Sequence, residues 1–145
     1  MDSDSFSRLC KKDRVYFKTA ESLSELSDHH CRLGAVVVEH SHIIGSGYNS
    51  RTRCSPYQAR IDDKFFPNCE NRGPLHAETA ALIPLMKRRY DFSGTTLYVF
   101  RKNRNGELAM ARPCPRCMEV IKHCGIRKIK YSTPDGFATE KIVDW

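Results

Sequence analysis

The sequence of 145 residues contains no long hydrophobic run. Its N-terminus, MDSDSFSRLCKKDR, lacks the apolar segment of a signal peptide, and no stretch is long enough to cross a bilayer. Internal repeats, low-complexity segments and a GxxxxGK phosphate loop are also missing. These absences argue against a membrane protein and a repeat array, and no phosphate loop supports a separate effector site. The missing signal peptide and membrane span predict a cytoplasmic protein.

The composition fits one ordinary globular unit. With 40% hydrophobic residues the chain can fill a single core, so we expect one domain over residues 1–145. The formal net charge of +7 favours anionic partners, which include phosphorylated metabolites as well as nucleic acid. No single run of basic residues dominates, so a modestly basic surface is the simpler interpretation of this charge.

Expected helices and strands alternate along the chain, as judged from hydrophobic spacing and turn residues. The expected elements are helices over 12–28, 75–90 and 115–124, a hairpin over 33–50, strands over 95–100 and 126–133, and a short edge strand or helix in the C-terminal tail. This order predicts an α/β fold, a three-layer α/β/α sandwich. The apolar hairpin is expected to be buried on both faces.

The first predicted helix is amphipathic. Its apolar positions recur at three- and four-residue steps and are expected to form the buried face. They are Val15, Tyr16, Thr19, Leu23 and Leu26.

Between Ser50 and Gly73 the hydrophobic periodicity is lost. We interpret this segment, 50–73, as an insertion, because a long stretch without regular structure inside a domain is usually functional or tied down. Its basic residues are candidates for binding a substrate phosphate, although a solvated loop would have the same composition. These residues are Arg51, Arg53, Arg60, Lys64 and Arg72.

Two predicted helices begin with a polar turn. One start reads PLHAETAAL, which places His76 and Glu78 before an apolar segment that should be buried. The other reads PCPRC, in which Cys114 and Cys117 are three residues apart and share a helix face. Helix N-termini favour thiolates, because their unpaired N–H groups create positive partial charge. If the two starts face each other, one imidazole and two thiolates can bind one metal ion.

Three ligands of this kind indicate zinc in a catalytic site. Structural zinc sites usually have four protein ligands, whereas catalytic sites keep one position for water. Glu78 is the nearest carboxylate and can move protons beside the ion, while the small Ala77 leaves room for a flat substrate. H-x-E followed by P-C-x-x-C is the signature of zinc deaminases, whose glutamate is a general acid and base rather than a ligand. A purely structural zinc site is the alternative interpretation.

At these residues the chain resembles the cytidine and deoxycytidylate deaminase superfamily, especially its deoxycytidylate and nucleotide deaminase branch with small phage-type members. The similar segments, in the family's order, are LGAVVV, IIGSGYNS, HAE, TLYVF, PCPRCMEVI and GIRKIKYST. The resemblance implies a mixed five-stranded sheet with helices on both faces, and zinc bound by His76, Cys114 and Cys117. It also implies hydrolytic loss of an exocyclic amine, in which activated water attacks C4 of cytosine and Glu78 carries protons to N3 and to ammonia.

The same resemblance implies further features. Asn49, at the end of GYN, falls where relatives hold the sugar or nucleotide, although it also suits a turn that closes a strand. Relatives are commonly homo-oligomers, and some have a second, structural zinc, for which Cys54 and Cys69 in the insertion are candidates, with 29–31 nearby. The motif departs from the deoxycytidylate deaminase pattern at Ala80, where those proteins commonly have asparagine.

Together these features predict a small-molecule enzyme that converts dCMP to dUMP and ammonia. One alternative is a deaminase of another nucleoside or nucleobase, or of a base in single-stranded nucleic acid, which the net charge permits. Tyr57, Phe65 and Phe66 are the obvious stacking residues for that alternative. A zinc-binding module without enzymatic activity is a lesser alternative.

Overall fold

A mixed five-stranded sheet organises the part of the chain that the structure describes, which comprises residues 6, 8–50, 60 and 76–142 of this computed structural model. The strands are β1 (Leu33–Glu39), β2 (His42–Tyr48), β3 (Thr95–Arg101), β4 (Lys128–Thr133) and β5 (Gly136–Lys141). Their order is β2-β1-β3-β4-β5, and β3 and β4 are parallel while the other neighbours are antiparallel. The tail therefore forms an edge strand, and the mixed five-stranded sheet that the resemblance implied is confirmed.

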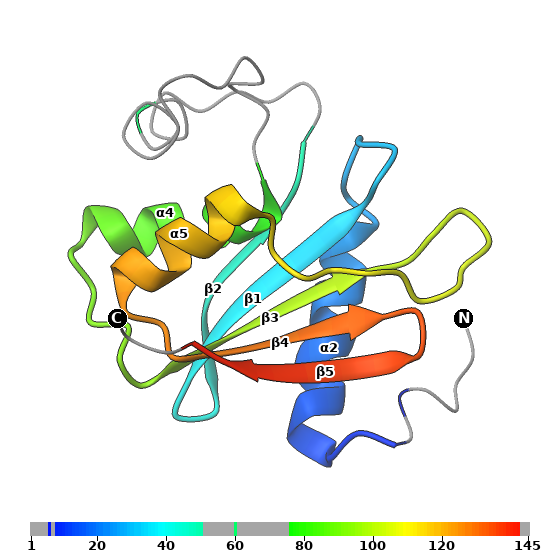
Figure 1. The fold of residues 1–145 in the computed structure, drawn as a ribbon, viewed down its shortest axis with the longest axis horizontal. Helices are drawn as coiled ribbons and strands as arrows, with labels where there is room; N and C mark the ends of the chain where they lie inside the picture. Colours follow the sequence, from blue (N-terminus) through cyan, green and yellow to red (C-terminus); the bar gives the residue numbers. More distant parts are fainter. Residues whose placement is uncertain (1–5, 7, 51–59, 61–75, 143–145) are drawn as a thin grey trace.

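Helices cover both faces of the sheet (Figure 1). The helices are α2 (Lys11–Ser24), α4 (Ala77–Lys87) and α5 (Pro115–Cys124). Val36 and Val38 of β1 point into the core beside α2, whereas Ala35 and Val37 point into the core beside α4 and α5. The predicted three-layer sandwich is thus confirmed. None of the described helices is long and apolar enough to cross a membrane.

The buried face of α2 differs from the prediction. Val15 is 52% exposed, and Leu26 lies beyond the end of the helix and is 63% exposed. Phe17 is buried instead, with its ring edge-on to that of Tyr98 at 5.2 Å between centroids. The aromatic side chains of the sheet therefore determine which face of α2 is buried. Its buried residues are Tyr16, Phe17, Ala20 and Ser24.

The hairpin over 33–50 is buried on both faces only in its first strand. The five central residues of β1 are buried, because this strand lies between β2 and β3 and is covered by helices on both sides. β2 is an edge strand, and its first two residues, His42 and Ile43, are exposed. The expectation of burial on both faces was therefore wrong for β2. Most of the 50–73 insertion lies outside the described residues, and the single-domain assignment stays a prediction.

Two glycines allow helices to approach the sheet closely. A Cβ atom on Gly34 of β1 would overlap the carbonyl oxygen of Ala20 and lie 2.8 Å from the backbone nitrogen of Ser24, both in α2. On β2, a Cβ on Gly47 would lie 2.6 Å from the Cβ of Ala80 in α4. Any larger residue would push the helix away, so Gly47 fixes the first turn of α4 against the sheet.

Because α2 lies so close to β1, the stability of the protein should be sensitive to a side chain at Gly34. Gly34→Ala should lower the free energy of unfolding by about 3 kcal/mol or more, because the added methyl meets rigid helix backbone rather than a movable side chain. Gly94→Ala is the matched control, since nothing lies within 4 Å of its new Cβ. Denaturant unfolding of both variants measures the difference. Equal stabilities of the two variants would contradict the packing described here.

Candidate metal centre and active site

The two helix starts that the sequence singled out lie next to each other. His76 is the N-cap of α4 and Cys114 is the N-cap of α5, each with extended backbone angles. Their carbonyls accept the first helical hydrogen bonds, from the N–H groups of Ala80 at 2.9 Å and Met118 at 2.8 Å. Neither side chain caps its own helix, so each projects beyond the helix end towards the other.

The ligand atoms have the spacing of a tetrahedral zinc site. His76 Nδ1 lies 3.5 Å from Cys117 Sγ and 3.8 Å from Cys114 Sγ. All three ligand atoms lie within 4.8 Å of one another. With Zn–N of about 2.0 Å and Zn–S of about 2.3 Å, tetrahedral geometry places nitrogen and sulfur about 3.6 Å apart. The two distances from His76 Nδ1 to the sulfurs therefore fit tetrahedral zinc coordination.

The pKa values of the Cys114 and Cys117 thiols are shifted in opposite directions. A hydrogen bond from Cys117 to Cys114 lowers the pKa of Cys114, with His76 adding to the effect. The same hydrogen bond, together with burial, raises the pKa of Cys117. The hydrogen bond thus places one proton between the two sulfur atoms. A bound dication would replace that proton and favour both thiolates.

The carboxyl group of Glu78 lies beside the ligand residues in the first turn of α4. Glu78 is only 4% exposed, and burial raises its pKa, with His76 acting in the opposite direction. Cys117 is within hydrogen-bonding reach of this carboxyl group. A buried carboxyl group with a raised pKa can hold and release a proton near neutral pH.

A cavity of about 220 Å³ opens onto this group. Its walls come from α4, from the segment before α5 and from the ends of three strands. The lining residues are Leu33, Asn49, His76, Ala77, Glu78, Arg101, Met110, Arg112 and Cys114. The structure therefore brings all six predicted site residues together, because Cys117 lies beside His76 and Cys114.

Asn49 lines the cavity but already makes three hydrogen bonds. Its Oδ1 accepts from Ser27 Oγ at 2.7 Å and from the backbone N–H of Leu33 at 2.9 Å. Its Nδ2 donates to the carbonyl of Cys31 at 2.6 Å. The amide thus ties the end of β2 to the segment before β1, and one of its N–H groups has no partner among the described residues. A contact between Asn49 and substrate stays a prediction.

Sequence reasoning missed four of the lining residues, which are Leu33, Met110, Arg101 and Arg112. Two signals could have indicated the arginines. Arg101 ends β3, and in α/β sheets the carboxyl ends of parallel strands form ligand sites. Arg112 immediately precedes the PCPRC motif.

Ala80, where the motif departs from the deoxycytidylate deaminase pattern, does not line the cavity. Its side chain faces Gly47 of β2, where a larger group would meet the sheet. The substitution therefore concerns helix packing more directly than the cavity wall. It does not argue against a nucleotide in the cavity.

The suggested second zinc site lies mostly outside the described residues. Cys54 and Cys69 lie outside the described residues, whereas the ligand atoms of His29, His30 and Cys31 lie within 4.8 Å of one another. A second zinc stays a prediction.

Metal analysis tests the ligand set. Cys114→Ala should remove one zinc ion per chain, because two ligands cannot hold the ion as three do. Cys124→Ala is the control, since this thiol lies two turns beyond Cys117 on the same helix, about 10 Å away. Native mass spectrometry should find wild-type zinc content in the control. Wild-type zinc content in Cys114→Ala would show that the ion is bound elsewhere.

The chain matches known proteins both in its sequence motifs and in its fold. The family model of the cytidine and deoxycytidylate deaminase zinc-binding region matches residues 10–133, which include HAE and PCPRC. The chain is 28% identical over 130 residues to the deoxycytidylate deaminase of Mycobacterium phage D29, covering 82% of this chain and 92% of that protein.

Solved structures agree with this match. The apo dCMP deaminase of cyanophage S-TIM5 is 28% identical with a TM-score of 0.56, over 90% of this chain and 84% of that one. The same enzyme in complex with dCMP and dUMP is 26% identical with a TM-score of 0.57, over 86% and 83%. Cytidine deaminase from Burkholderia pseudomallei shares the fold at 16% identity and a TM-score of 0.58, over 88% and 90%. The chain belongs to the zinc-binding cytidine and deoxycytidylate deaminase family.

Proposed function

We propose that this protein deaminates dCMP hydrolytically, forming dUMP and ammonia in a zinc-dependent reaction. The observation that carries the proposal is the meeting of the ligand atoms of His76, Cys114 and Cys117 with the buried carboxyl group of Glu78 at one small cavity. Relatives from two phages, both named as deaminases of this nucleotide, support dCMP as the substrate.

In this proposal His76, Cys114 and Cys117 hold the zinc ion. When bound, zinc supplies a Lewis acid that lowers the pKa of a water ligand. Glu78 takes a proton from the attacking water and delivers it to N3 of the cytosine ring. It then takes the second proton, from the hydroxyl group now on C4, and gives it to the exocyclic amine, which leaves as ammonia. Burial of Glu78 suits this role. Because burial raises its pKa, the carboxylate can accept a proton from water and pass it on to the base.

Shape and solvent exclusion come from the neighbouring residues. Ala77, which is fully buried, offers only a methyl group to the cavity and so leaves space for a flat ring. Leu33 adds an apolar wall at the start of β1. Cytoplasmic localisation and assembly into a homo-oligomer stay predictions that accompany this function.

A substrate panel tests the proposed function directly. Release of ammonia should be measured with dCMP, CMP, deoxycytidine, cytosine, adenine and guanine derivatives, and single-stranded DNA. We expect dCMP to be the preferred substrate and oligonucleotides to remain unchanged. Turnover of oligonucleotides without turnover of dCMP would instead favour a nucleic-acid deaminase.

The role of Glu78 can be separated from metal binding. Glu78→Gln should keep zinc but lower kcat by about 10²- to 10⁴-fold, because an amide cannot relay the proton. Glu119→Gln is a matched control on the exposed side of α5 and should retain wild-type kcat. Zinc content and steady-state rates are measured on both proteins. Near-wild-type turnover of Glu78→Gln would refute the assigned role.

A further inference from the structure

Two arginine side chains line the cavity, and they differ in their partners. Arg112 donates to both carboxylate oxygens of Glu140, from Nε and Nη2, at 2.9 Å each. Among the residues that the structure describes, the guanidinium group of Arg101 contacts a sulfur and a carbonyl, with Nη2 3.4 Å from Cys31 Sγ and Nη1 3.4 Å from the oxygen of Met110. Among the described residues, no carboxylate pairs with Arg101.

The guanidinium group of Arg101 is incompletely satisfied. Its Nε is buried and has no hydrogen-bond partner in the part of the chain that the structure describes. A buried N–H of a charged group is costly to leave unpaired. Of the two contacts of the terminal nitrogens, the one to the Met110 carbonyl is long and the one to Cys31 is to a weak sulfur acceptor. An anion in the cavity would compensate this positive charge, whereas the charge of Arg112 is already compensated by Glu140.

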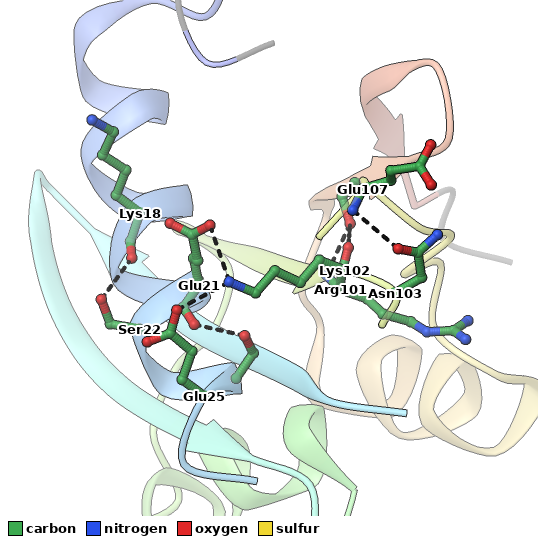
Figure 2. A network of polar contacts seen from close by, with 10 residues as sticks. Lys18, Glu21, Ser22, Glu25, Arg101, Lys102, Asn103 and Glu107 are labelled. Atoms are coloured by element: carbon green, nitrogen blue, oxygen red, sulfur yellow. Dashed lines mark hydrogen bonds and ion pairs between the residues drawn. The ribbon is translucent and has the colours of Figure 1, made fainter. Parts of the chain in front are cut away.

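The position of Arg101 is fixed by its backbone and by its neighbour. Its N–H donates to Ser132 Oγ at 2.9 Å, and its carbonyl accepts from the N–H of Ala109 at 3.0 Å. Lys102 Nζ lies 3.0 Å from Oε1 of Glu25, the C-cap of α2, and 3.7 Å from Oε2 of Glu21 within that helix. Figure 2 shows the side chain of Lys102 reaching towards these two glutamates, while that of Arg101 points the opposite way. Arg101 is therefore held on the cavity side of β3.

The depth of the cavity indicates which part of a nucleotide would meet Arg101. Glu78 is buried beside the metal ligands, so the reacting base must lie at that inner end. Arg101 is only half-buried, and its neighbour Met110 is 48% exposed. The guanidinium thus lies at the open end of the cavity, where a phosphate can keep part of its hydration. Its planar fork matches phosphate oxygens in a bidentate arrangement.

We propose that Arg101 binds the 5′-phosphate of a nucleoside monophosphate and makes the site selective for nucleotides over nucleosides. This inference rests on the proposed function, because it assumes that the base is processed at the inner end. It places phosphate recognition at the end of β3 rather than on the basic residues of the 50–73 insertion. Arg112 then remains bound to Glu140 as part of the cavity wall.

Comparing nucleotide with nucleoside tests this assignment. Arg101→Gln should lower kcat/KM for dCMP by about 10- to 100-fold, the range for a hydrogen bond between charged groups, and should leave deoxycytidine unchanged. Titration calorimetry should show the same loss of affinity for dUMP but not for deoxyuridine. Arg88→Gln, an exposed arginine at the far end of α4, is the control and should behave as wild type.

The outcomes separate this inference from the proposed function. Equal losses for dCMP and deoxycytidine, or no loss for either, would overturn the phosphate contact of Arg101. Failure of the wild-type protein to deaminate dCMP would refute the proposed function alone, because the dUMP titration still reports the contact. If Arg101→Gln does not fold, Arg101→Lys tests the phosphate contact instead. Lysine keeps the positive charge but lacks the planar guanidinium group that binds two phosphate oxygens. Wild-type preference for dCMP in Arg101→Lys would overturn bidentate binding.

Discussion

The meeting of two helix N-termini is the constraint on which the site depends. Both helix ends have positive partial charge, which is unfavourable beside a metal dication unless negative ligands intervene. Cys114 and Cys117 provide that negative charge, and the same helix ends stabilise their thiolates. Close packing of α4 against Gly47, together with the β3-α5-β4 connection, keeps His76 within 3.8 Å of both sulfurs. The ligand set and the packing of the fold are therefore consistent with each other.

Charge is distributed unevenly around the cavity. The inner end holds the thiols and the buried carboxyl group of Glu78, whereas Arg101 and Arg112 lie nearer the opening. Glu140 neutralises Arg112, so among the described lining residues the uncompensated positive charge is that of Arg101. An electrophilic inner end and a cationic opening suit a substrate with a polar ring and a remote anionic group. This arrangement links the deaminase chemistry to nucleotide selectivity.

The sequence indicated the residues of the metal group, because the spacing within HAE and within PCPRC follows local helix geometry. That the two motifs meet was an assumption at that point, and it depends on how α4 and α5 pack. The three-layer α/β fold followed from the alternation of helices and strands, and the mixed five-stranded sheet from the resemblance to a family. The sequence did not indicate that Phe17 rather than Val15 faces the core, since that choice depends on the distant ring of Tyr98. Arg101 was missed for a similar reason. Its place in the cavity depends on the pairing of β1 with β3, which puts Leu33 opposite Arg101.

The central claim is that one zinc ion lies between the two helix starts. A crystal of the zinc-loaded protein, measured on both sides of the zinc absorption edge, tests it most directly. We predict an anomalous difference peak within bonding distance of His76 Nδ1 and of the sulfurs of Cys114 and Cys117, at about 2.0 Å and 2.3 Å respectively. Zinc peaks found only elsewhere in the molecule would contradict the account.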